Sequence, residues 1–191
     1  MSANKVQFNL KKVHYAILTT TVGTGGVITN TFGTPVHVPG AVSLSLEARG
    51  EVTPFYADGI TYYQSIANNG YEGDLEMAKI PDAMLEDVWG LTAGTTSKVL
   101  TENAAVEPKP FALLFQIDGD ADEEYYVVYN CMGTRPAISS ETNTDTKEPK
   151  TQTSSITASA LSDGKVMART TADSPSATKS GWFSSVFVEG S

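Results

Sequence analysis

The stretch FALLFQIDGDADEEYYVVYNC, residues 111–131, is the part of the sequence that most directly indicates the fold. Two runs rich in aromatic and branched residues, 111–117 and 125–131, flank the polar segment 118–122. Aromatic and branched side chains favour strands, whereas Asp and Gly favour turns. The stretch therefore predicts an antiparallel β-hairpin.

Alternation of apolar and polar residues predicts further strands on both sides of this hairpin. Residues 42–48 and 71–77 alternate cleanly, as expected for a sheet with one buried and one wet face. Residues 6–18 change parity near Lys11 and Lys12, which predicts a bulge or bend there. Shorter extended pieces are predicted at residues 60–63, 155–161 and 166–169. The chain is therefore expected to be mainly β.

One short α-helix is predicted at about residues 80–90. Pro81 stands at its start, Asp82 places negative charge in its first turn, and Gly90 supplies a stop. The residues of its expected apolar face are Ile80, Met84, Leu85 and Val88.

Long polar stretches at residues 23–40, 90–110 and 133–154 are predicted to be loops, with 23–26 as a hairpin tip. Such loops either order on a neighbouring chain or contain further strands. We expect residues 1–172 to form one β domain and residues 173–191 to form a polar tether with a short apolar end. That end could dock on its own domain or on a partner.

Composition narrows the function. The formal net charge of −9 argues against a surface that binds nucleic acid, which would need cations to meet phosphates. Cys131 is the only cysteine, so no intramolecular disulfide can form. No run approaches the ~18 apolar residues of a membrane span, and residues 1–12 lack the apolar segment of a signal peptide. Folding in a reducing cytoplasm is expected.

No catalytic, cofactor or metal site is expected. His14 and His37 lie in different segments without a cysteine cluster, and no nucleophile elbow or P-loop is found. Residues 118–122 resemble the start of a calcium loop, but Glu123 and Tyr129 occupy the positions that need Gly and Glu. We therefore do not expect an enzyme.

Charge is unevenly distributed along the chain. Residues 47–124 contain 16 acidic and four basic residues, whereas the N-terminal arm carries Lys5, Lys11 and Lys12. Such segregation suits head-to-tail contacts between copies, in which one patch meets a different patch. An evenly solvated acidic surface explains the same counts without any contact.

The order of several segments resembles a known family. These are FNLKKVHYA at residues 8–16, YADGITYY at 56–63, GYEGDL at 70–75, the acidic helix at 80–90 and the strand pair that follows. Together, over roughly residues 5–165, they resemble the major tail protein (tail tube protein) family of long-tailed siphophages of Gram-positive hosts.

The resemblance implies an antiparallel β-sandwich or partly rolled barrel with one short flanking helix and long loops. It implies a virion protein whose copies close into hexameric rings that stack into the tail tube, a conduit for DNA ejection. The implied partners are further copies of the protein and other tail proteins, such as the tape measure and tail terminator proteins. DNA would pass through the lumen without specific binding, no membrane would be involved, and the protein would be made in the host cytoplasm and reside in the virion tail.

Candidate functional residues follow from the resemblance and the charge pattern. Carboxylates in or beside central strands are candidates to face the lumen: Asp74, Glu76, Asp118, Asp120 and Glu123. Charged residues of the N-terminal arm and the connections are candidates for contacts between subunits or rings: Lys11, Lys12, Glu47, Arg49, Glu51, Asp58, Arg135, Lys147 and Lys150.

Two other functions remain open at this point. A head–tail joining or capsid decoration protein would form rings or trimers without long tubes. A glycan-binding β-sandwich module would use an aromatic platform, with Tyr62, Tyr63, Tyr71 and Trp89 as its candidates.

Overall fold

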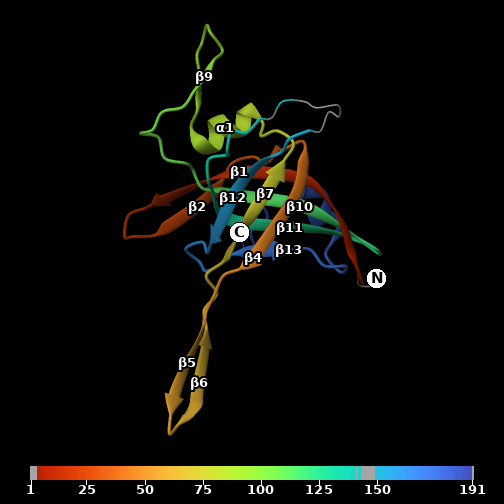
Figure 1. The fold of residues 1–191 in the computed structure, drawn as a ribbon. Helices are drawn as coiled ribbons and strands as arrows, with labels where there is room; N and C mark the ends of the chain where they lie inside the picture. Colours follow the sequence, from red (N-terminus) through yellow and green to blue (C-terminus); the bar gives the residue numbers. More distant parts are fainter. Residues whose placement is uncertain (1–3, 141, 143–148, 191) are drawn as a thin grey trace.

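The computed structural model describes residues 4–140, 142 and 149–190, and nine of the strands in these residues form one large antiparallel sheet (Figure 1). Along the sheet the strands run in the order β2-β1-β10-β11-β12-β7-β4, with β3 paired to β1 and β13 paired to β11. Their bounds are β1 (Gln7–Val22), β2 (Ile28–Phe32), β3 (Val36–His37), β4 (Ala41–Ala48), β7 (Tyr71–Met77), β10 (Phe111–Gly119), β11 (Glu123–Gly133), β12 (Gln152–Ser159) and β13 (Met167–Arg169).

The predicted hairpin at residues 111–131 is confirmed as β10 and β11. Leu114 pairs with Val127 and Asp118 pairs with Glu123 in an antiparallel register. Both faces of this hairpin are covered, because Leu113 belongs to one apolar cluster and Leu114 to another. Burial on both faces explains why this stretch is apolar without the alternation seen at residues 71–77.

The sheet curls so that β4, at one end, contacts β1, near the other end. The larger apolar cluster fills the space between β1-β10-β11 and β12-β7-β4, with side chains such as Tyr15, Phe111, Leu75 and Ile156. The expected mainly β, sandwich-like, partly rolled architecture is confirmed. In the part of the chain that the structure describes, the sheet does not close into a barrel.

The predicted bulge in the first strand is also confirmed. The register of β1 against β10 shifts between Lys11 and His14, and Lys12 has a positive φ of 48°. The bulge adds one residue to β1 relative to β10. Leu10 and Val13, which would point to opposite faces of a regular strand, can therefore both reach the same apolar cluster.

Helix α1 (Asp82–Trp89) lies within the predicted range and covers one end of the curled sheet (Figure 1). Met84 and Val88 are buried as predicted, and Gly90 ends the helix in the left-handed region at φ 67°. Pro81 precedes the first helical residue as its N-cap.

The first two stretches predicted as loops contain strands, and the last three residues of the third, 152–154, belong to β12. Residues 23–40 hold β2 and β3, and residues 90–110 hold the small hairpin of β8 (Thr92–Ala93) and β9 (Leu100–Thr101). Because its threonines and asparagine are polar, the β2 sequence ITNTF predicts a loop. It becomes a strand because it pairs with the last five residues of β1, across the predicted turn at residues 23–26.

The C-terminal segment folds back onto its own sheet. It contains a second helix, α2 (Ser176–Gly181), whereas the sequence predicted only one helix. Trp182 is buried among Tyr125, Val127 and Tyr129 on the outer face of β10 and β11. Its indole N–H donates to the carbonyl of Tyr126 at 3.2 Å. Of the two docking alternatives, the structure shows the apolar end on its own domain.

Candidate self-assembly surfaces

A β-hairpin arm formed by β5 (Val52–Ala57) and β6 (Ile60–Ile66) projects from the body of the molecule (Figure 1). Its turn, Asp58-Gly59, has positive φ at both positions, 52° and 77°, as a tight hairpin turn requires. The arm is an apolar surface that stands in solvent: the exposed large hydrophobic residues are Val52, Phe55, Tyr56, Ile60, Tyr62, Tyr63 and Ile66.

The base of the arm is held firmly to the sheet. Arg49 donates its backbone N–H to Gly70 at 2.8 Å, and Asn69 donates to Arg49 at 2.9 Å. A Cβ on Gly50 would lie 1.9 Å from the carbonyl oxygen of Ala67. The two backbone segments that form this neck therefore lie too close together for any residue other than glycine at position 50. The close packing fixes where the arm leaves the body.

An arm of this composition is not explained by the folding of a single chain. An isolated two-stranded hairpin is marginally stable in water, and contiguous exposed apolar patches on soluble proteins mark interaction surfaces. Tyr62 is 71% exposed and Ile66 is 76% exposed. The arm therefore has the properties of a surface that is buried in an assembly.

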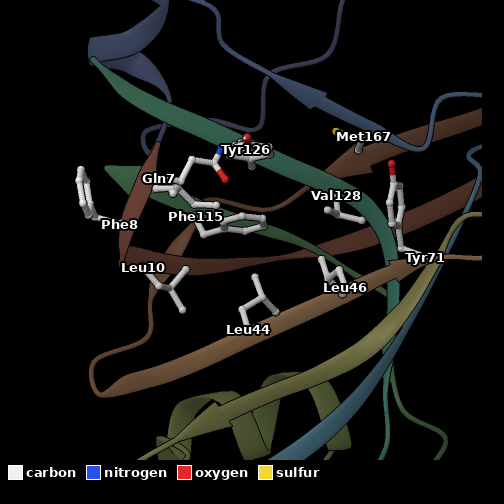
Figure 2. A pocket seen from close by; sticks show the side chains of 11 residues that line it. Gln7, Phe8, Leu10, Leu44, Leu46, Tyr71, Phe115, Tyr126, Val128 and Met167 are labelled. Carbon is white, nitrogen blue, oxygen red and sulfur yellow. Dashed lines mark hydrogen bonds between the residues drawn. The ribbon is translucent and has the colours of Figure 1, made fainter. Parts of the chain in front are cut away.

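A cavity of about 360 Å³ lies inside the open side of the curled sheet (Figure 2). Leu44 and Leu46 of β4 face Phe115 and Val128 of β10 and β11 across it. The other lining residues come from β1, β7, β10, β11 and β13: Gln7, Phe8, Leu10, Tyr71, Ile117, Tyr126 and Met167.

A polar network stands on one side of the cavity. The side-chain amide of Gln7 donates to the Tyr126 hydroxyl and to Glu124, both at 3.1 Å. The Tyr126 hydroxyl donates in turn to Glu124 at 2.7 Å, and Arg169 lies 3.5 Å from both groups. The cavity is thus apolar inside, with amide and hydroxyl groups at its edge.

Two of the predicted lumen residues, Asp74 and Glu76, lie on the face of β7 turned away from the core. Ser155 donates to Asp74 at 2.6 Å, and Thr151 and Ser43 donate to Glu76 at 2.5 and 2.8 Å. The Thr151 and Ser43 hydroxyls hold the pKa of Glu76 below its usual value. The neighbouring positions of β4, β7 and β12 make this a hydroxyl-rich, acidic sheet face: Ser43, Ser45, Glu47, Glu72, Thr153 and Thr157.

The other three predicted lumen residues lie around the β10–β11 turn: Asp118 near the end of β10, Asp120 in the turn and Glu123 at the start of β11. In the described chain no strand pairing joins β7 to β10, or to this end of β11. Each has a partner within its own chain. Lys11 lies 2.5 Å from Asp118 and lowers its pKa, the backbone N–H of Lys5 donates to Asp120 at 2.8 Å, and the Tyr125 hydroxyl donates to Glu123 at 2.5 Å. The five residues therefore form two separate groups.

The residues predicted to make contacts between subunits are spread over several elements. Lys11 pairs with Asp118, Lys12 lies over the rings of Tyr125 and Phe183, and Arg49 pairs with Glu72 at 3.3 Å. The remaining positions are Glu47 on β4, Glu51 at the base of the arm, Asp58 at its tip, Arg135 paired with Glu102, Lys150 before β12, and Lys147, which lies outside the described residues. The prediction from the sequence included Glu51 and Asp58 but missed the apolar arm on which Asp58 stands and beside which Glu51 lies.

The aromatic platform proposed for a glycan-binding module is not formed. Trp89 is 3% exposed and donates its indole N–H to the carbonyl of Gly133 at 3.0 Å in the core. Tyr71 lines the cavity, whereas Tyr62 and Tyr63 are on the arm. The platform considered for this alternative function is therefore incomplete, because Trp89 at the end of α1 points into the core.

Within residues 4–140, 142 and 149–190, no group of three or more His, Cys, Asp or Glu side chains is placed to hold a metal ion. The same residues include no helix that is long and apolar enough to cross a membrane.

No protein-family model and no curated protein matches this chain. Among solved structures, the chain is similar to the cryo-EM structure of the anti-feeding prophage cap (AFP tube terminating cap). The match has a TM-score of 0.44 and 13% identity, over 87% of this chain and 94% of that one.

Proposed function

We propose that the protein is a structural, non-enzymatic phage tail protein that assembles with copies of itself into hexameric rings, which stack to form a tail tube. The observation that supports self-assembly best is the β5–β6 arm, whose apolar side chains stand in solvent in the single chain. The sequence resemblance to tail tube proteins supplies the class of assembly and its partners, the tape measure and terminator proteins among them.

The acidic face of β4, β7 and β12 suits the lining of a DNA conduit. Six copies at a net charge of −9 each would carry about −54, and proteins that hold DNA need cations against its phosphates. Asp74 and Glu76 are held by hydroxyl donors, while Lys79, near the end of β7, pairs with Asp82 at 3.5 Å. A lumen formed by this face would let DNA slide without binding.

The direct test is electron microscopy of the purified full chain at low and high concentration. Six-fold rings that stack into hollow tubes are expected. Rings that never stack would favour the joining or decoration function, and single particles of 20.3 kDa at every concentration would contradict self-assembly.

A matched pair of variants shows whether the arm is responsible. Phe55→Ser with Tyr63→Ser removes a cross-strand aromatic pair from the arm, and assembly is expected to fail. Ile138→Ser with Val99→Ser removes two exposed apolar side chains elsewhere and should leave assembly intact. Equal behaviour of the two variants would exclude the arm as the assembly surface.

A further inference from the structure

We propose that the β5–β6 arm of one copy inserts its aromatic side chains into the cavity between β4 and β10-β11 of the next copy. The inference rests on the proposed self-assembly and names the two surfaces that meet. The arm is exposed and apolar, and the cavity is an open apolar hollow lined mainly by buried and half-buried side chains. No described segment of the same chain covers the arm or fills the cavity.

The two surfaces match in polarity. Residues 52–66 carry one charged side chain, Asp58 at the tip, and the eleven residues that line the cavity carry none. Burying one against the other therefore removes apolar area from water without desolvating an ion pair. The hydroxyl of Tyr63 would still need a partner, and Gln7 and Tyr126 offer an amide and a hydroxyl beside the cavity.

The sizes also match. Phe55 and Tyr63 are cross-strand partners, so their rings stand on the same face of the arm. An apolar cavity of ~150 Å³ can hold a benzene molecule, so a cavity of about 360 Å³ has room for two aromatic rings. Phe55 and Tyr63, at ~150–250 Å² each when fully buried, would supply roughly half of the ~800 Å² that a partner buries in a standard interface.

The position of the arm relative to the cavity makes this a contact between different copies. The arm begins where Ala48 pairs with Tyr71, and Tyr71 also lines the cavity. From there the arm extends away from the body (Figure 1), and six or seven residues at about 3.3 Å each place its tip ~20 Å from its base. The tip therefore meets the cavity of another copy, and contacts between two different patches generate rings or filaments.

Disulfide cross-linking of introduced cysteines tests the contact, because Cys131 is buried and gives little background. The double variant Tyr63→Cys with Leu44→Cys is expected to give a ladder of covalent oligomers on oxidation. The control, Tyr63→Cys with Val22→Cys, places the second cysteine at an exposed position on the far end of β1 and should give none. Equal ladders, or a product that stops at the dimer, would overturn the inference.

A second variant covers the case in which the introduced cysteines disturb assembly. Leu46→Trp fills the cavity, whereas Val42→Trp changes an exposed position of the same strand that does not line the cavity. With folding of both verified by circular dichroism, only Leu46→Trp should block assembly. If Leu46→Trp still assembles, or if the Tyr63→Cys with Leu44→Cys variant forms tubes without a disulfide between copies, the arm–cavity contact is rejected while the proposed function stands. Absence of any wild-type assembly would reject the proposed function itself.

Discussion

The hydroxyl of Tyr15 donates a 2.7 Å hydrogen bond to Oδ2 of Asp87, and this bond links strand β1 to helix α1. The ring of Tyr15 is buried in the larger apolar cluster, and burial together with Asp87 raises the pKa of its hydroxyl. The helix is short, so contacts of this kind hold it on the end of the sheet.

Tyr15→Phe should lower the free energy of unfolding by about 1.5–3 kcal/mol, because it removes a hydrogen bond to a charged group. Denaturant unfolding measures the change. Asp82→Asn, in the same helix, removes an exposed pair with Lys79 and the negative charge of the first turn, and should cost about 1 kcal/mol. Equal losses would show that the Tyr15–Asp87 bond has no special weight.

Trp182→Ala should destabilise the protein by about 3–5 kcal/mol, since the indole is 2% exposed and covers Tyr125 and Val127. Thermal unfolding followed by circular dichroism would show a single, lower transition. Ile138→Ala, at a side chain that is 97% exposed, should change stability by less than about 0.5 kcal/mol. An unchanged Trp182→Ala protein would mean that the C-terminal segment does not stabilise the sheet.

Stability should fall as the pH drops below about 6.5, the ordinary pKa of histidine. Burial lowers the pKa of His14, which stacks on Phe183 and lies near His37 and Lys12. The unfolded chain therefore binds a proton at a higher pH than the folded one. The stabilisation is complete above pH 6.5 and decreases between that pH and the lowered pKa.

Denaturant unfolding at pH 7.5 and pH 5.0 measures this loss. His14→Phe keeps a ring against Phe183 but cannot titrate, so its stability should change less over the same interval. The carboxylates with lowered pKa, such as Glu76 and Asp118, lose their contribution only at more acidic pH. Identical pH profiles for the wild type and His14→Phe would exclude His14 as the source.

Gly50→Ala should disturb the neck of the arm and reduce assembly. Its Cβ would overlap the carbonyl oxygen of Ala67, and relief of such overlap typically costs about 1–3 kcal/mol. Gly181→Ala meets nothing within 4 Å and serves as the matched control. Sedimentation of assembled material, normalised to folded protein, would separate the two. Normal assembly of Gly50→Ala would show that the direction of the arm is unimportant.

Local signals in the sequence were sufficient for several elements of the fold. The β10–β11 hairpin, the bulge at Lys12 and the stop at Gly90 each depend on a few neighbouring residues. Strand β2 was missed although its partner β1 directly precedes it, because its polar threonines and asparagine give no strand pattern. The buried position of Trp182 could not be predicted in this way, because its partners on β11 lie far away in the sequence.

The candidate surfaces show the same division between local and long-range information. The alternation at residues 71–77 correctly placed Asp74 and Glu76 on a polar face. It could not show that β4 and β12, with their serines and threonines, flank β7. Residues 60–63 were correctly read as extended, but strand-forming side chains do not reveal whether a strand joins the sheet or leaves it, so the exposed arm was missed.

Reversing the charge of Asp74 tests the role of the acidic face separately from assembly. Asp74 is exposed and contacts Ser155, and it lies on the opposite side of β7 from Leu75 and the core. Asp74→Lys should therefore leave rings and tubes intact while it adds six cations to each ring of the proposed lumen. Retention of DNA by purified tubes should rise and should weaken with added salt, as phosphate contacts do. Asp74→Asn removes the charge without reversing it, so tubes of this variant should retain less DNA than tubes of Asp74→Lys. Loss of tubes in Asp74→Lys would instead place this residue at a contact between subunits.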